Sequence, residues 1–259
     1  MINSTSNKQI KNLVQLQSKA KARREQGLFV VEGIRMYREV PKELLVKTYI
    51  SESFYEKEKN QDLLAGCETE IVTDRVFASV SDTKTPQGIL CLVRQREYSL
   101  EQMIKESHPL LLILEDIQDP GNLGTIFRTA EAAGVSGIVM SNGTADIYNP
   151  KTIRSTMGAV YRMPFCYKKD LVPVLGELKK HHISTYAAHL RGEREYTAEN
   201  YQTGCAFMIG NEGNGLSEEL AEQADVYIKI PMSGQAESLN AAVAAAILMY
   251  EARRQRSGS

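Results

Sequence analysis

Continuous apolar runs recur through the second half of the chain, where they are separated by stretches with helical periodicity. A run that is apolar on both faces suits a parallel strand covered by helices. These runs predict strands at 110–114, 137–140, 205–209 and 226–230. We therefore expect an α/β fold with a parallel sheet in this half of the chain.

Two helices are predicted beside these strands. Apolar residues between positions 123 and 130 recur at helical spacing, so we expect a helix that starts near Asn122 and ends at Gly134. Residues 239–254 form an alanine-rich segment that predicts the longest helix of the chain.

The first half alternates shorter elements. A helical stripe runs through residues 6–27 and ends at Gly27, a typical C-cap residue. It is followed by predicted strands at 28–31, 46–50, 70–72 and 88–93 and predicted helices at 34–40, 54–64 and 75–80. We expect a small α/β domain at 1–96, a charged linker at 97–108 that ends before Pro109, and a second domain at 109–259.

Composition is that of a globular protein, because 42% of the 259 residues are hydrophobic and 24% are charged. The net charge of −1 gives no overall basic field, so any nucleic-acid surface must be local. Basic residues do cluster in two places, which are either RNA-binding surfaces or solvated helix faces. The clusters are Lys8, Lys11, Lys19, Lys21, Arg23 and Arg24 near the N-terminus, and Arg253, Arg254 and Arg256 near the C-terminus.

Four scattered cysteines predict neither a disulfide framework nor a zinc site. The longest apolar run, 241–250, is too short to span a bilayer, and the N-terminus is polar. We therefore expect a cytoplasmic protein with reduced thiols and no membrane partner. The cysteines are Cys67, Cys91, Cys166 and Cys205.

Segment 119–128 follows a predicted strand and opens a helix. Its glycines and the helix N-terminus offer backbone N–H groups to an anion, and Asn122 is a favoured N-cap residue. Gly124, Arg128 and Glu131 share one face of the helix. A purely structural alternative makes Asn122 a cap and Arg128 a surface partner of Glu131.

Segment 207–216 is a strand that runs into a glycine-rich turn. The order Gly210, Gly213, Gly215 is the reverse of the dinucleotide-binding fingerprint, which disfavours a nicotinamide enzyme. Glu212 lies among these glycines, where a carboxylate is unusual unless it accepts hydrogen bonds; a surface turn is the alternative.

Segment 228–240 leads into the alanine-rich helix. Ser238 or Asn240 can cap that helix, which leaves the other for a different task. Met232 and Leu239 flank the polar turn, and they either sandwich an adenine ring or belong to the core.

The order, spacing and strand contexts of the three segments together resemble the SpoU (TrmH) family of RNA ribose 2'-O-methyltransferases, a branch of the SPOUT class. The resemblance covers 109–256 and includes segment 151–159 between the first two motifs. It implies a parallel sheet with a trefoil knot, preceded by a small α/β domain that binds the RNA substrate. It also implies a homodimer and S-adenosylmethionine held by backbone groups around Gly210, Ile230, Met232 and Leu239.

The same resemblance makes Asn122, Arg128, Glu212, Ser238 and Asn240 the catalytic residues, with no metal. An arginine rarely loses a proton, so we expect Arg128, pinned by a phosphate or by Glu212, to stabilise the developing alkoxide. Ribosomal RNA is the expected substrate. The alternatives are transfer RNA, base methylation, a binding-only protein of this fold, and a metal hydrolase built on His181, His182 and His189.

Overall fold

The computed structural model describes residues 1–57, 64 and 66–257, and the chain divides into two compact units. Unit 1 consists of Met1–Arg96 and Asp146–Tyr161, and unit 2 consists of Glu97–Ala145 and Arg162–Ser259. Residues 146–161 thus pack in the N-terminal unit, whereas the domain boundaries predicted from the sequence place them in the second domain.

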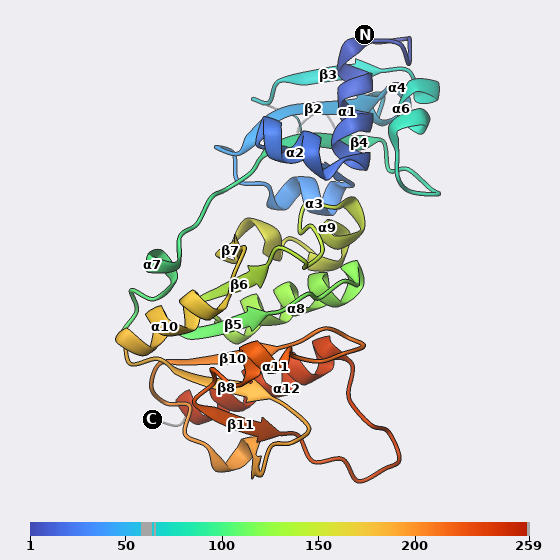
Figure 1. Ribbon diagram of the computed structural model, residues 1–259. Coiled ribbons are helices and arrows are strands. Elements are labelled where there is room, and N and C mark those ends of the chain that lie inside the picture. The colour runs from blue at the N-terminus through green and yellow to red at the C-terminus, as the bar shows by residue number, and fades with distance from the viewer. Residues whose placement is uncertain (58–63, 65, 258–259) are drawn as a thin grey trace. The chain divides into compact units, whose positions relative to one another are not determined.

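Unit 1 is built on a four-stranded sheet in the order β1-β4-β2-β3 (Figure 1). Strand β4 is antiparallel to β1 and β2, whereas β2 and β3 are parallel. Each predicted strand is found within one residue at either end. The strands are β1 (Leu28–Glu32), β2 (Leu45–Ser51), β3 (Thr69–Val72) and β4 (Ile89–Arg94).

Helices cover this sheet, and α1 and α6 contribute Leu13, Leu16 and Phe77 to the core. The predicted helix at 54–64 begins as α4, and most of its remainder lies outside the described residues. The helices of unit 1 are α1 (Lys8–Ser18), α2 (Ala20–Gln26), α3 (Ile34–Glu39), α4 (Glu52–Tyr55), α6 (Asp74–Val80) and α9 (Pro150–Thr156), with a 3-10 turn at Ala159–Tyr161.

The single helix predicted at 6–27 is wrong, because the chain breaks at Lys19, which has extended backbone angles. Arg23 explains the break. Its Nη1 donates to the carbonyls of Leu16 and Gln17 at 2.6 and 3.0 Å, which satisfies groups that a continuous helix would have used. Its Nε and Nη2 donate to Asp146 Oδ2 at 2.9 and 2.6 Å, so this arginine also fastens segment 146–161.

Unit 2 contains a seven-stranded sheet in the order β7-β6-β5-β10-β8-β11-β9, and every pair of neighbouring strands is parallel. The predicted α/β class with a parallel sheet is confirmed, although β7, β8 and β9 were not predicted. The strands are β5 (Leu110–Leu114), β6 (Gly137–Ser141), β7 (Phe165–Lys168), β8 (Ser184–Ala188), β9 (Arg194–Glu195), β10 (Cys205–Ile209) and β11 (Val226–Lys229).

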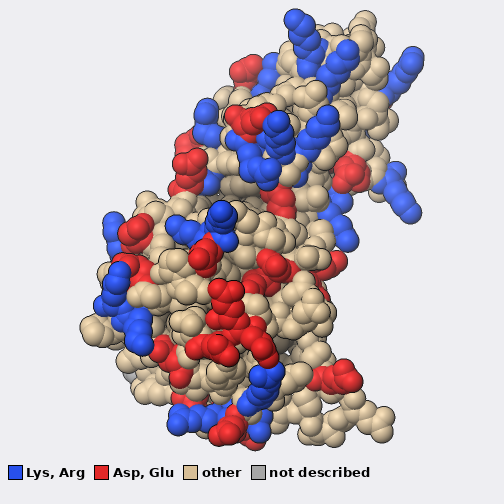
Figure 2. Space-filling model, in the orientation of Figure 1, with Lys and Arg blue, Asp and Glu red and all other residues tan. Residues whose placement is uncertain are grey.

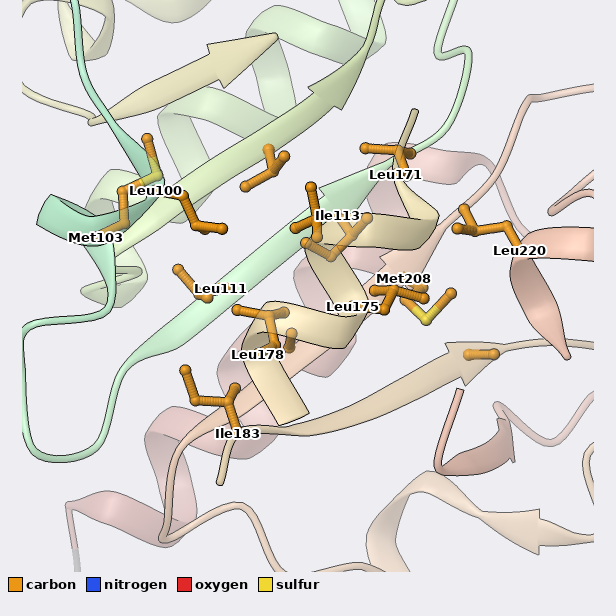
Figure 3. Close-up of a cluster of buried hydrophobic side chains, with 14 of the residues drawn as sticks. Leu100, Met103, Leu111, Ile113, Leu171, Leu175, Leu178, Ile183, Met208 and Leu220 are labelled. Carbon is orange, nitrogen blue, oxygen red and sulfur yellow. The ribbon is translucent and has the colours of Figure 1, made fainter. Parts of the chain in front are cut away.

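Helices also pack on the sheet of unit 2. Leu175 and Leu178 of α10 point toward Ile113 of β5 and Met208 of β10 (Figure 3). Helix α12 packs against α8 and β10. The helices are α7 (Leu100–Met103), α8 (Pro120–Ala133), α10 (Val172–Lys180), α11 (Glu218–Ala221) and α12 (Ala241–Arg256), with a 3-10 turn at Tyr196–Ala198. None of the helices in the described part of the chain is long and apolar enough to cross a membrane.

The strand order of unit 2 fixes where a ligand site can form. From β5 the chain proceeds outward through β6 to β7, whereas β10, β8, β11 and β9 lie on the other side of β5. In open parallel sheets, ligands bind beyond the carboxyl ends of the strands, near the point where the strand order reverses. Segments 115–122 and 210–217 follow β5 and β10 at this point.

Candidate active site

Helix α8 begins at Pro120, not at Asn122. Asp119 is the N-cap, because its Oδ1 accepts the backbone N–H of Asn122 at 2.8 Å. Proline suits the first helical position, because a backbone N–H at that position would have no acceptor within the helix. The predicted capping role of Asn122 is therefore wrong, and its side chain is available for another role.

The turn after β10 is closed by its own backbone. The N–H of Asn211 donates to the carbonyl of Gly215 at 3.0 Å, and the N–H of Gly215 donates back at 2.9 Å. The Asn211 side-chain oxygen accepts two further backbone N–H groups of the turn. A Cβ at Gly210 would lie 2.0 Å from the carbonyl carbon of Gly215, so only glycine fits there. This rigid turn holds Glu212 in place.

Glu212 accepts three N–H donors from the start of α8. Its Oε1 accepts the backbone N–H of Asp119 at 3.1 Å and Asn122 Nδ2 at 3.0 Å, and its Oε2 accepts the backbone N–H of Gln118 at 3.1 Å. Partial burial by itself raises the pKa of Glu212, but the hydrogen bonds from Asn122 and the backbone bring the pKa below its ordinary value. The carboxylate is therefore ionised and a poor proton acceptor.

Asn240 connects the third motif to the other two. Its Oδ1 accepts the backbone N–H groups of Ala242 and Val243, so Asn240 and not Ser238, the other predicted candidate, caps α12. Its Nδ2 must then point away from the helix, and it donates to Asn122 Oδ1 at 2.9 Å. A directed chain of hydrogen bonds thus runs from Asn240 through Asn122 to Glu212, which fixes the orientation of both amides.

Arg128 is exposed on α8, and among the described residues it makes no hydrogen bond or ion pair. Glu131 does not hold it, because Glu131 accepts Arg162 Nε at 2.9 Å. Glu212 does not hold it either, since Glu212 accepts the donors named above. Its guanidinium is therefore available to a ligand.

A cavity of about 680 Å³ lies at the carboxyl ends of β10, β8 and β11. Its volume is in the range of small-molecule sites. The residues predicted from the sequence that line it are Gly210, Glu212, Ile230, Met232, Ser238 and Leu239. Asn122, Arg128 and Asn240 are not among the residues that line this cavity.

One wall of the cavity was not predicted from the sequence, and it consists of Ala188 at the end of β8, His189 and Leu190 after it, and Glu195 on β9. Strand β8 has the sequence Ser-Thr-Tyr-Ala-Ala, which lacks the apolar run by which the other strands were found. Burial and the nearby charge of Arg191 lower the pKa of His189, whose Nδ1 accepts the Arg191 backbone N–H at 3.1 Å. His189 is therefore neutral.

The lining suits a nucleoside-containing ligand. Leu190 and Met232 are large apolar side chains, yet 73% and 36% of their surfaces are exposed, so a flat apolar ring would bury area on both. The glycines of the 210–215 turn let the ligand approach the backbone, where N–H and C=O groups can pair with a base and ribose.

The two basic clusters differ in what their side chains contact. Lys8, Lys11, Lys19, Lys21 and Arg24 are exposed, and Lys and Arg side chains gather over α1 and α2 (Figure 2). Arg23 is buried against Asp146 and does not belong to this surface. In the C-terminal cluster Arg254 pairs with Glu251, and Arg256 donates to the carbonyls of His108, Pro109, Tyr201 and Thr203. That cluster is mainly structural, because its arginines hold the end of α12.

Within the described residues, no group of three or more His, Cys, Asp or Glu side chains is placed to hold a metal ion. All four cysteines are free thiols. His181 lies at the end of α10, where its Nε2 is 3.4 Å from Glu177 Oε1, whereas His189 lies beside the cavity. The structure thus offers nothing in favour of a metal hydrolase.

A parallel sheet with a small-molecule cavity beyond the switch in strand order defines an α/β enzyme of the kind that binds nucleotide-like cofactors. Residues 109–250 match the SpoU rRNA Methylase family, and residues 7–91 match the MRM3-like substrate binding domain. The chain belongs to the SpoU rRNA Methylase family, as its motifs predicted.

Individual relatives agree with this assignment. The 23S rRNA (guanosine(2553)-2'-O)-methyltransferase RlmP of Bacillus subtilis is 35% identical, over 97% of this chain and 98% of the relative. A crystal structure of AdoMet-bound rRNA methyltransferase from Sinorhizobium meliloti is 29% identical with a TM-score of 0.83, covering 98% of this chain and 97% of that one. A crystal structure of an RNA 2'-O ribose methyltransferase is 32% identical with a TM-score of 0.82 and covers 99% of both chains.

Proposed function

We propose that this protein transfers a methyl group from S-adenosylmethionine to a ribose 2'-hydroxyl of ribosomal RNA. The observation that carries the proposal is the chain of hydrogen bonds from Asn240 through Asn122 to Glu212, beside a cavity suited to a nucleoside. The relatives named for ribose 2'-O methylation and for bound AdoMet support the same reaction and cofactor.

The cavity residues divide into two roles. Gly210, Ile230 and the backbone of Met232 and Leu239 would hold the cofactor, and the apolar side chains of Met232, Leu239 and Leu190 would cover its adenine ring. When bound, the cofactor supplies a methyl sulfonium, which is already a strong electrophile. The task left to the protein is to orient the 2'-hydroxyl and to stabilise the charge that develops on it.

Arg128 stabilises that charge. A guanidinium keeps its proton at neutral pH and does not act as a base there. Glu212 is a poor base as well, because its pKa is lowered and three donors surround it. We therefore assign Arg128 as a fixed positive charge that faces the developing alkoxide, as the donors of an oxyanion hole do, and the 2'-hydroxyl proton passes to solvent water as the methyl group is transferred. Asn122, Glu212, Ser238 and Asn240 position the ribose and the start of α8.

Two further properties belong to this proposal. We place a trefoil knot in unit 2, as in the class that the motifs resemble. We also infer a homodimer, because α12 buries one face in unit 2 and still exposes Val243 and Tyr250 at 47% and 48% on another. Exposed apolar side chains on a helix whose other face is buried fit a second copy of the chain. Arg128 then acts near the cofactor of the partner subunit.

RNA binding is assigned to residues 1–96, whose exposed lysines on α1 and α2 suit a phosphate backbone. The match of residues 7–91 to a substrate binding domain supports this assignment.

We also propose a division of the chain into the RNA-binding domain at 1–96, a linker at 97–108 and a methyltransferase domain at 109–259. Ribosomal RNA as substrate also implies a cytoplasmic protein. Transfer RNA remains the alternative substrate.

The test is methyl transfer from labelled S-adenosylmethionine to ribosomal RNA by wild type, Arg128→Ala and Arg128→Lys, with cofactor affinity measured separately. We expect both variants to bind the cofactor normally and to lose about 100-fold or more in rate, since an ammonium lacks the planar fork of a guanidinium. Lys180→Ala, at an exposed basic residue of α10 that does not line the cavity, is the control. Wild-type rates in the Arg128 variants would refute its role, and cofactor binding without any transfer by the wild type would favour a binding-only protein.

A further inference from the structure

The glycine-rich turn of unit 2 serves two parts of the site at once. All seven residues from Gly210 to Leu216 line the cavity, and the same turn carries Glu212 to the start of α8. Any change in the shape of this turn therefore alters both the cofactor cavity and the placement of Asn122.

Two residues that follow β5 hold the turn at its two ends. At the first end, Asn211 Nδ2 donates to the backbone carbonyl of Asp116 at 2.9 Å. At the second end, Glu115 accepts the backbone N–H of Ser217 at 2.7 Å through Oε2 and the Ser217 hydroxyl at 2.6 Å through Oε1. The backbone N–H of Glu115 also donates to Ile209, the last residue of β10, at 2.9 Å.

We propose that Glu115 is a positioning residue of the methyl-transfer site, which sets the shape of the 210–217 turn for both the cofactor and Glu212. The proposal rests on the function proposed above. The Glu115 side chain ties the far end of the turn to β5, and hydrogen bonds to a carboxylate are shorter and stronger than those between neutral groups. Glu115 is not among the residues that line the cavity, so it acts through the turn.

The effects of Glu115 on the cofactor cavity and on Glu212 are measured separately, as the cofactor Kd and as kcat. Glu115→Ala frees the Ser217 end of the turn, so we expect a cofactor Kd raised about 10-fold and a kcat lowered about 100-fold, since displacements near 1 Å cost that much. The Kd for RNA stays at the wild-type value, because no RNA-binding surface changes. Glu115→Gln keeps an oxygen for the Ser217 N–H and offers an N–H to its hydroxyl, so it restores part of both losses.

A double-mutant comparison shows the route of the effect. In an Asn122→Ala background, Glu115→Ala has little left to perturb in kcat, but it still weakens cofactor binding about 10-fold. Ser217→Ala removes one of the two bonds and gives a smaller change in the same direction. Glu218→Ala, one residue further along, removes an exposed carboxylate paired with Arg191 and serves as the control with unchanged kinetics.

Isothermal titration with S-adenosylmethionine and steady-state methyl transfer measure these quantities. The inference is overturned if Glu115→Ala keeps the cofactor Kd and kcat of Glu218→Ala, or if it weakens RNA binding and lowers Tm in proportion to its loss of activity. An inactive wild-type protein would instead refute the proposed function. An active wild type with normal Glu115 variants refutes only the role of Glu115.

Discussion

At the scale of single residues, the side-chain oxygens of Asn240, Asn122 and Glu212 organise the site, because each already accepts a hydrogen bond from a neighbouring group. Asn240 caps α12 with its oxygen, so its nitrogen faces Asn122, and the nitrogen of Asn122 then faces Glu212. Each amide orientation follows from a neighbouring bond, so none of these side chains rotates without breaking one. The same occupancy makes Glu212 a structural carboxylate and leaves the exposed guanidinium of Arg128 as the charge of the site that is available to a ligand.

The lowered pKa of Glu212 predicts a pH dependence of stability. A carboxyl whose pKa is lower in the folded state stabilises the fold above its unfolded pKa, here the ordinary value of 4.5, and this contribution is lost as pH falls through the folded value. We expect the free energy of unfolding of Glu212→Gln to be lower than that of wild type at pH 6, and the difference to shrink as pH falls below 4.5 and through the lowered pKa of Glu212.

Urea unfolding across this pH range measures the effect, with Glu237→Gln as the control. Glu237 lines the same cavity and lies in an exposed segment, so its substitution should leave the pH profile unchanged. A wild-type profile in Glu212→Gln would show that the three hydrogen bonds contribute nothing to the fold.

The sequence did identify the residues of this network, but it assigned one of them wrongly. Asp119 and Asn122 are both favoured caps and lie three positions apart, so residue preference does not choose between them. The proline between them was the available signal, since proline favours the first helical position and so marks Asp119 as the cap. The role of Glu115 was not visible, because it depends on the adjacency of β5 and β10, which are distant in sequence.

At the scale of elements, the strands that were predicted are those that bury both faces. β5 and β10 are found at their predicted bounds, because each is a five-residue apolar run buried throughout. β7 contains Cys, Tyr and Lys, β8 begins with Ser and Thr, and β9 has two residues that pair with β11. Such strands are specified by their neighbours in the sheet, which a pattern along one chain does not reveal.

The break between α1 and α2 leads to a prediction about stability. The Arg23 side chain is 3% exposed, so removal of its partner leaves a buried charge. We expect Asp146→Ala to lower the free energy of unfolding of unit 1 by about 3 kcal/mol. Circular dichroism during urea unfolding measures this change.

The pair Lys21 and Glu25 on the same helix is the matched comparison, because both side chains are well exposed at 80% and 64%. Glu25→Ala should therefore change the free energy of unfolding by no more than about 0.5 kcal/mol. Equal effects of Glu25→Ala and Asp146→Ala would contradict the role of Arg23 in fastening segment 146–161.

At the scale of the whole molecule, helix α12 combines two faces with different partners. Leu248, Met249 and Ala252 are fully buried in unit 2, whereas Val243 and Tyr250, seven positions apart, share an exposed face. A helix that is apolar on both sides is normally covered on both sides. The proposed dimer supplies the second cover and explains why no polar residue occupies these two positions.

We therefore predict that wild type sediments as a dimer and that Tyr250→Glu, which places a charge on this face, sediments as a monomer with reduced methyl transfer. Tyr55→Glu is the control, since Tyr55 is 41% exposed on α4 in unit 1, outside the lysine-bearing helices α1 and α2. A monomeric wild type, or a dimeric Tyr250→Glu, would contradict an interface at α12.

The dimer also determines how the site can be complemented. If Arg128 serves the partner's cofactor, a mixed dimer of Arg128→Ala and Asn240→Ala subunits contains one site with both residues intact. Random pairing makes half of the dimers mixed, so equal mixing of the two inactive variants restores about a quarter of the wild-type rate. If Arg128 serves the cofactor of its own subunit, every site lacks one residue, and mixing restores nothing. Methyl transfer before and after subunit exchange distinguishes the two arrangements, because neither variant alone contains an intact site under either of them.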